Sequence, residues 1–269
     1  MKIKITHSTT YKYNSTVPRL IQCLKLYPSV CDNQEIIEWK TFSSSGKILE
    51  SHTDALGHRI QNIFINNFHG QLKITSKGIL KTKDLSGVVK GLKEKVNPLC
   101  FLRETDLTRP CKNIEKISEN AKKNNKNQIE FAHKLNLIVS NSINYTSGST
   151  TTSTSSKEAL RQKKGVCQDF AHILISAARF NQLPARYVNG FLLEETVSGV
   201  NTTHAWVEIF INNLGWVAFD PSHKKCIDDK YIRISTGFDF EDASIIKGVK
   251  NNYNGDEFLD TKVNIENCQ

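Results

Sequence analysis

The sequence predicts an α+β fold in which a small all-β domain comes first and a region of helices followed by antiparallel strands comes after it. Residues 1–85 contain short segments rich in β-branched and aromatic residues, and turn residues separate these segments. From about residue 113 the apolar residues recur at helical spacing, and strand patterns return after Pro184. We therefore expect a β-rich domain over 1–85, a crossover segment over 86–112, and an α+β core over 113–269.

Five segments of the first region have strand patterns. The turn residues SSSG, ALG and NNFHG separate them, as in a small sandwich or barrel. Pro98 and Pro110 mark the segment that follows as a crossover between the two units. The five segments are KIKITHSTTYKYN, EIIEWKTF, KILESHTD, HRIQNIFIN and GQLKITSKGIL.

The second region opens with two helical patterns, NIEKISENAKK and NQIEFAHKLNLIVSNSI. In the second pattern, apolar residues such as Ile129 and Ala132 recur at helical spacing. The stretch 146–156, TSGSTTTSTSS, is nearly all Ser and Thr and predicts an exposed loop. A short capped helix follows in SSKEALRQKKG, where Ser156 is the expected cap and Gly165 the expected stop.

A long helix is expected over 167–180, and its sequence FAHILISAARF is apolar on nearly every face. A helix of this kind is buried, so we expect a rigid central element. Pro184 follows the helix. Three strand patterns come after it, namely ARYVNGFLLE, HAWVEIFI and GWVAFDP.

The composition indicates a soluble globular protein. With 38% hydrophobic and 23% charged residues among 269, the chain can bury a full core. No run approaches the ~18 apolar residues of a membrane span, so we expect no membrane partner. The first residues, MKIKITHSTTYKYN, alternate like a strand and lack the apolar core of a signal peptide, so we expect a cytoplasmic protein.

The cysteines and the net charge argue against two further classes, a zinc or thioredoxin-like site and a basic nucleic-acid binder, and the second is kept as a less favoured alternative. None of the seven cysteines forms a CxxC pair, which gives little support for a zinc ribbon or a thioredoxin-like site and fits free thiols in a reducing compartment. The net charge of +9 raises the question of nucleic-acid binding. The densest basic stretch, ENAKKNNKN, has no interleaved aromatic residues and no nucleic-acid motif, so we expect a solvated basic surface and no nucleic-acid partner.

Cys167 differs from the other cysteines because GVCQDFAH places it at the start of the apolar helix. A free cysteine is by default a small core residue. The first turn of a helix, however, has unpaired N–H groups and a partial positive charge, which stabilise a thiolate and lower the pKa of the thiol. His172 lies about 140° around the helix axis from the thiol and Asp169 about 200°, so neither faces it. We expect a packed His172, an Asp169 that suits the helix N-terminus, and a base from elsewhere.

The best candidate for that base is His204, which opens the strand pattern THAWVEIF. Glu208 shares its face of the strand, while the alternate residues from Ala205 form the core face. Asp220 closes GWVAFDP, and Pro221 favours an extended backbone before it. Glu208 is a poor partner for the imidazole because it lies about 13 Å along the strand. A structural histidine and an Asp-Pro turn are the ordinary alternatives.

The loop between these two strands decides whether His204 and Asp220 can meet. The residues NNLG link strands 204–211 and 216–220, which should form a hairpin. Opposed residues share a face of the sheet, and a change of one residue in the loop reverses that face. A three-residue loop, with Gly215 in a left-handed or bulge position, puts both side chains on one face. A two-residue Asn-Asn loop puts them on opposite faces, so a Cys–His–Asp triad requires the odd loop or a bulge.

The motifs GVCQDFAHILISAARFNQLPARYVNGFL and THAWVEIFINNLGWVAFDPSH together resemble the core of bacterial transglutaminase-like proteins. Cys167, His204 and Asp220 fall on the three motif positions of that superfamily, in its order. The segment YIRISTGFDFEDASIIKGV (231–249) resembles the tail that follows the Asp motif, and residues 1–85 resemble the β-rich region that precedes the core. The resemblance implies a papain-like transglutaminase core, with helices packed on an antiparallel sheet, preceded by the small all-β domain.

The resemblance also implies a cysteine peptidase or amidase that acts on peptide or protein substrates by thiol acyl transfer. Cys167 would attack the amide carbonyl, His204 would accept and return the proton, and Asp220 would orient the imidazole. No step requires a metal or an organic cofactor. The acidic loops that form calcium sites in animal transglutaminases are not recognisable here.

Several alternatives stay open at this point. A protein-glutamine transamidase would use the same triad with an amine in place of water, and a non-catalytic module would use the cleft to bind a peptide. The N–H of Cys167 is one expected oxyanion donor. Tyr145, Trp206 and Gln168 are candidates for the second donor, and each has an ordinary structural role as its alternative.

Overall fold

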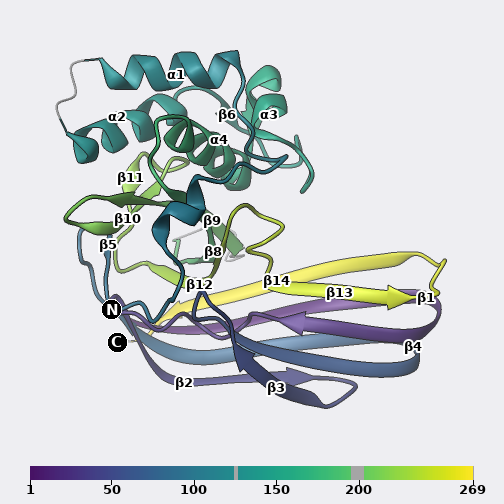
Figure 1. Ribbon diagram of the computed structural model, residues 1–269. Coiled ribbons are helices and arrows are strands. Elements are labelled where there is room, and N and C mark those ends of the chain that lie inside the picture. Colours follow the sequence, from purple (N-terminus) through teal and green to yellow (C-terminus); the bar gives the residue numbers. More distant parts are fainter. Residues whose placement is uncertain (124–126, 195–202, 269) are drawn as a thin grey trace.

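The computed structural model describes residues 1–123, 127–194 and 203–268. It contains two large sheets of antiparallel strands, and Figure 1 shows the helices gathered over the second sheet and away from the first. The β-rich first region and the helices followed by strands are both present, which confirms the predicted α+β class. Among the described residues, no helix has the length and apolar character needed to cross a bilayer.

Six strands form the first sheet. Its longest strands, β1 (Lys2–Leu24) and β4 (Arg59–Thr82), pair along most of their length. Alternate residues of each strand are buried, as expected for a sheet with one face against the interior. The sheet has the order β13-β1-β4-β2, with β14 also paired to β1 and β3 also paired to β4. The other four strands are β2 (Gln34–Ser43), β3 (Ile48–Thr53), β13 (Ile246–Asn251) and β14 (Glu257–Asn267).

The predicted turn NNFHG lies inside β4, so the prediction of two separate strands there is wrong. HRIQNIFIN and GQLKITSKGIL belong to one strand, and its register with β1 shifts between Tyr13 and Val17. At this point Asn67 and Gly70 have positive φ angles of 51° and 94°. The turn-forming residues cause an irregularity rather than a reversal, because β1 continues beside them and pairs with the backbone again on both sides.

The end of the chain returns to the first sheet. β14 pairs with the first half of β1 and β13 with its second half, both antiparallel. Val263 and Ile265 of β14 alternate onto the buried side of the sheet. Residues 246–267 thus complete a sheet that begins at Lys2, a return that no sequence pattern indicated. The division of the chain into three domains stays a prediction.

The second sheet contains the strands expected after Pro184. Its order is β11-β10-β9-β8-β12, with β5 paired to β10, and all pairs are antiparallel. β8 and most of β9 are buried on both faces, which explains why their sequences are apolar almost throughout. The strands are β5 (Val88–Val89), β8 (Ala185–Leu192), β9 (Thr203–Ile211), β10 (Gly215–Asp220), β11 (Lys225–Cys226) and β12 (Tyr231–Gly237).

α4 (Cys167–Phe180) is the central helix, packed on β8 and β9 with the other three α-helices around it. Every residue of α4 from Gln168 to Arg179 is buried, which confirms the rigid central helix. The remaining elements are η1 (Pro98–Leu102), α1 (Lys112–Lys122), α2 (Gln128–Ser140), α3 (Ser156–Gln162) and the short parallel pair β6 (Asn144–Tyr145) and β7 (Lys164–Gly165).

The ends of α3 differ from the prediction by one to two residues. Ser155, not Ser156, caps the helix: its hydroxyl accepts the N–H of Glu158, whose carboxylate accepts the N–H of Ser155. The helix stops at Lys163, which is left-handed with a φ of 54°, rather than at Gly165 in β7. The capping box with Glu158 therefore decides which of the two adjacent serines caps the helix.

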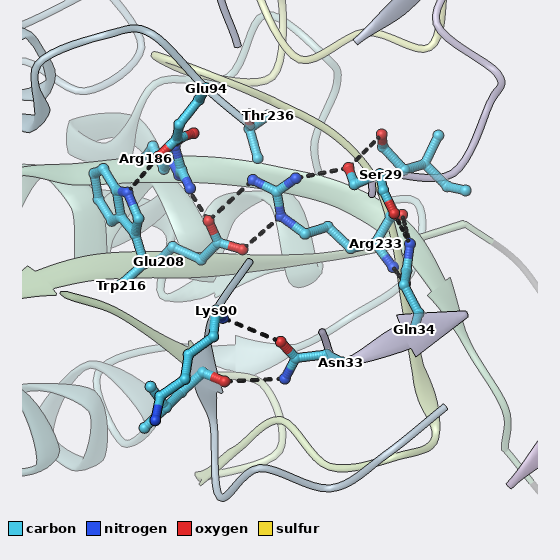
Figure 2. Close-up of polar contacts among 12 residues, drawn as sticks. Ser29, Asn33, Gln34, Lys90, Glu94, Arg186, Glu208, Trp216, Arg233 and Thr236 are labelled. Atoms are coloured by element: carbon cyan, nitrogen blue, oxygen red, sulfur yellow. Dashed lines mark hydrogen bonds and ion pairs between the residues drawn. The ribbon is translucent and has the colours of Figure 1, made fainter. Parts of the chain in front are cut away.

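A buried ion cluster joins the second sheet to Glu94 of the crossover segment and to Ser29 (Figure 2). Glu208 of β9 lies between two guanidinium groups, 2.6 Å from Arg186 Nε and 2.8 Å from Arg233 Nε. Arg186 also donates to Glu94 of the crossover segment, which accepts the indole N–H of Trp216. Burial opposes ionisation, but the two arginines lower the pKa of Glu208 to about 2. The cluster therefore fixes the middle of β9 with charged bonds from both sides.

Candidate active site

Cys167 is the first residue of α4, and its side chain is half-buried. The extended residue before it, Val166, donates its N–H to Asp169 Oδ2 over 2.8 Å, and Thr150 Oγ1 donates to the same oxygen over 2.7 Å. A Cβ on Gly165 would lie 2.6 Å from the Cβ of Asp169, so the close approach in this turn requires glycine. The local sequence thus fixes the thiol at the positive end of the helix dipole.

The two polar neighbours on α4 are bonded elsewhere, as the helical geometry predicts. His172 is fully buried, and its Nε2 accepts the N–H of Phe240 over 3.2 Å. Burial lowers the pKa of His172 to about 4, so this ring is neutral at neutral pH. Asp169 closes the start of the helix, and burial raises the pKa of its carboxyl. Neither residue is a base for the thiol.

The hairpin between β9 and β10 has the three-residue loop that the triad requires. Ile211 pairs with Gly215, and Gly215 has a φ of 84°. The pairing of Glu208 with Ala218 then puts every second residue of β10, including Asp220, on the His204 face. His204 Nε2 lies 2.6 Å from Asp220 Oδ2 as a result. The predicted loop length and the shared face are confirmed.

The Cys167 thiol is close enough to the His204 ring to influence its protonation. Burial by itself lowers the pKa of His204, but hydrogen bonds with Asp220 and with the Cys167 thiol raise it to about 10. Because Nε2 faces Asp220, Nδ1 is the ring nitrogen left for the thiol. The ring is 9% exposed, so the chain of thiol, imidazole and carboxylate lies at the edge of the interior rather than in open solvent. The structure brings together all three residues that the sequence singled out.

Asp220 is fully buried and accepts hydrogen bonds on both oxygens. Besides His204, Oδ2 accepts from His223 Nδ1 and Tyr231 Oη, each at 2.8 Å. Oδ1 accepts from the N–H and the hydroxyl of Ser222, at 2.9 and 2.6 Å. Burial opposes the charge, but the bonds from the two histidines hold the pKa of Asp220 well below its usual range. The carboxylate is therefore ionised and fixed in orientation.

His223 and Tyr231 are site residues that sequence reasoning missed. The Asp-Pro pair predicts a turn, and a turn over DPSH returns His223 to the aspartate three residues before it. That signal was present in the sequence. Tyr231 has no such local signal, because it opens β12 on the far edge of the sheet, and only the pairing of β12 with β8 brings it to the site.

The three candidates for a second oxyanion donor differ in their surroundings. The amide of Gln168 donates to Thr152 O over 3.1 Å, so it is already engaged. Trp206 is fully buried, and its indole N–H has no partner among the described residues. Tyr145 is 57% exposed, and its ring stacks on Phe170, one turn along α4 from the cysteine. Its phenol hydroxyl is protonated at neutral pH and can donate.

One group of side chains has the spacing of a metal site. His204, Asp220 and His223 each offer one donor atom, and these atoms lie within 4.8 Å of one another. Two imidazoles and a carboxylate are ligands that first-row metal ions accept. Here hydrogen bonds of 2.6 and 2.8 Å already join each imidazole to the carboxylate, so N–H protons occupy the space between the donor atoms. We interpret the group as a proton-sharing chain, and the expectation of a cofactor-free site stays a prediction.

Two family models match parts of the chain. Residues 115–221 match the family model of the transglutaminase-like superfamily, and residues 3–81 match that of the bacterial transglutaminase-like N-terminal region. The uncharacterized protein Rv2569c of Mycobacterium tuberculosis is 33% identical over 131 residues, which cover 45% of this chain and 42% of that protein. The match thus spans less than half of that relative's length. The uncharacterized protein ML0607 of Mycobacterium leprae is 25% identical over 280 residues, or 98% of each chain.

A solved structure extends the likeness to the whole fold. The crystal structure of a candidate cysteine protease from Cytophaga hutchinsonii superposes with a TM-score of 0.76 at 20% identity, over 100% of this chain and 92% of that one. At this identity the superposition shows a shared fold and nothing more. The family matches support an enzyme of the general papain-like type.

Proposed function

Because the chain belongs to the transglutaminase-like superfamily, we propose that it is a thiol-dependent acyl-transfer enzyme that cleaves amide bonds in peptides or proteins. Cys167 is the nucleophile, His204 the general base and acid, and Asp220 the carboxylate that orients the imidazole. One observation carries this proposal: His204 and Asp220, from two neighbouring strands, are joined by a hydrogen bond of 2.6 Å, and the Cys167 thiol at the start of α4 lies close enough to raise the pKa of that imidazole.

In the first half of the reaction the thiol proton moves to Nδ1 of His204, and the sulfur attacks the amide carbonyl carbon. The developing oxyanion faces the N–H of Cys167, which has no acceptor within its own helix because it belongs to the first turn. His204 then gives the proton to the amide nitrogen, and the C–N bond breaks. The products of this half-reaction are a free amine and a thioester on Cys167.

In the second half a water molecule replaces the amine. His204 takes a proton from the water, the hydroxide attacks the thioester carbonyl, and the C–S bond breaks. The products are a carboxylic acid and the thiol, with the imidazole returned to its first state. Asp220 stays ionised throughout, because its pKa lies well below its usual range. Its charge stabilises the imidazolium that forms in both halves.

A primary amine in place of water would give transamidation through the same thioester. The family description favours keeping this second candidate, since every catalytic group is shared. We propose hydrolysis as the main reaction because water reaches any open thioester, whereas transamidation needs a bound amine. The proposed substrate is a peptide or protein, the proposed reaction uses no cofactor, and the cytoplasmic location stays a prediction.

The test is an incubation with a glutamine-containing peptide and a labelled primary amine, followed by mass spectrometry. We expect released ammonia or cleaved peptide with the wild-type chain and none with Cys167→Ala. Cys100→Ser is the matched control, because that cysteine is exposed on η1 and lies outside the site. Incorporated label would replace hydrolysis by transamidation. Identical products from wild type and Cys167→Ala would contradict the proposal.

A further inference from the structure

His223 bonds to two carboxylates at once. Its Nδ1 lies 2.8 Å from Asp220 Oδ2, and its Nε2 lies 2.8 Å from Glu194 Oε1. A neutral imidazole has only one N–H and can donate to only one of these acceptors. Both short contacts are satisfied together only by the imidazolium, so the geometry describes His223 as a cation between two anions.

This cation shares its acceptor atom with the catalytic histidine. His204 Nε2 and His223 Nδ1 both donate to Oδ2 of Asp220, at 2.6 and 2.8 Å. The two ring centroids are 5.2 Å apart, in an edge-to-face arrangement. When both rings are protonated, two positive charges compete for one oxygen, and each weakens the hold of the carboxylate on the other's proton.

The charged and titratable groups around His223 come from several elements. Asp220 and Glu194 attract its proton, and His204 repels it, while Tyr231 donates to the same Oδ2. The charge of the Cys167 thiolate, when present, lies beyond His204.

Two lysines close to His223 in the sequence are engaged elsewhere. Lys224 donates to Asn141, and Lys225 pairs with Asp228 and lies over the Tyr231 ring. The hydrogen bond with Asp220 is the main reason that the pKa of His223 is raised. Among the described side chains, the charge on His223 therefore depends chiefly on Asp220, with Glu194 adding to it and His204 opposing it.

We propose that His223 is a positioning residue of this site: as an imidazolium held between Asp220 and Glu194, it draws Asp220 away from His204 and so makes the catalytic imidazolium a readier proton donor. The inference deepens the proposed function and rests on it for its catalytic meaning. The proton that His204 receives from the thiol must later pass to the leaving amine. An aspartate shared with a second cation holds that proton less tightly than an aspartate that serves His204 alone.

The first test measures His204 itself and needs no substrate. In the full chain with 13Cε1-labelled histidine, NMR titration gives the midpoint of each ring, and His204→Gln assigns the signal of residue 204. His223→Gln keeps an N–H donor for Asp220 but removes the charge, so we expect the His204 midpoint to rise by about one pH unit. Glu194→Gln should move the His223 midpoint down. An unchanged or lowered His204 midpoint in His223→Gln, or a neutral His223 ring at neutral pH in the wild type, overturns the proposal.

The second test links the charge to the reaction. A tighter hold on the proton slows the loss of an amine, which must be protonated, more than the loss of an alcohol from an activated ester. We expect His223→Gln to reduce kcat for an amide by about tenfold while leaving kcat for the matched ester within about twofold. Lys224→Ala, an exposed neighbour outside the site, is the control for folding. Equal losses on both substrates would overturn the positioning role, whereas absence of all turnover together with the NMR shift would contradict the proposed function alone.

Discussion

Replacing Glu208 by Gln tests whether the buried ion cluster stabilises the second sheet. The carboxylate is fully buried between Arg186 and Arg233, and its pKa falls from 4.5 to about 2 on folding. A difference of about 2.5 pKa units corresponds to about 3 kcal/mol. Removing one partner of a buried ion pair independently suggests about 3–5 kcal/mol, because charged groups are left unpaired. We therefore expect Glu208→Gln to lower the free energy of unfolding by about 3 kcal/mol at neutral pH.

The sign of the pH dependence follows from the depressed pKa of Glu208. Its contribution is complete above the unfolded value of 4.5 and is lost as the pH falls toward about 2, where the folded carboxyl is protonated. The advantage of the wild type over Glu208→Gln should therefore shrink across that window. The difference in free energy of unfolding between the wild type and Glu208→Gln should stay constant between about pH 6 and pH 8, because this carboxyl does not titrate there.

Urea unfolding followed by circular dichroism measures the free energy at neutral pH and at several acidic values. Glu266→Gln is the matched control, since that carboxylate is exposed and its bond to Lys4 is 3.4 Å long, so its unfolding midpoint should stay at the wild-type value. Equal stability of Glu208→Gln and wild type at neutral pH would show that the ion cluster does not stabilise the fold. A gap that stays constant down to about pH 2 refutes the electrostatic origin of the effect.

Tyr231→Phe removes one of the three donors to Asp220 Oδ2, so kcat/KM should fall by about tenfold in steady-state assays, and the free energy of unfolding should fall by about 1.5–3 kcal/mol because the lost bond is buried and goes to a charged group. Unchanged kcat/KM would show that this bond does not contribute to the reaction. Deleting Asn213 shortens the hairpin loop from three residues to two and should turn Asp220 to the opposite face. We expect a folded chain by circular dichroism with no turnover, and wild-type activity would disprove the parity argument. Dialysis against EDTA should leave the alkylation rate of the Cys167 thiol unchanged. A slower or faster rate after dialysis would indicate a bound metal ion.

The parts of the site that follow from local rules could be predicted from the sequence. The start of an apolar helix places Cys167, and the parity of a three-residue hairpin loop puts Asp220 on the face of His204. Both rules act over a few residues, so the sequence contains all the information that they need. The position of His223 could be predicted only in part. The DPSH turn is a local signal, but the contact of His223 with Asp220 was not predicted from it.

The rest depends on contacts between distant parts of the chain. β13 and β14 pair with the edge of β1, and no pattern in their own sequences indicates β1 as the partner. Glu208 shares the face of His204, as predicted, but its two arginines come from β8 and β12. The strand β4 continues through turn-forming residues because β1 pairs with it on both sides of them. In each case tertiary pairing decides between local alternatives that the sequence leaves equal.

The most direct test of the account is the alkylation of Cys167 by iodoacetamide at mildly acidic pH, with the rate at each of the seven cysteines followed by mass spectrometry. We expect Cys167 to react at least about tenfold faster than exposed Cys100, because the nearby imidazole of His204 can accept the thiol proton and the first-turn N–H groups of α4 stabilise negative charge on the sulfur. His204→Ala should abolish that advantage. A Cys167 that reacts no faster than the other six thiols, or equally fast without His204, would contradict the account.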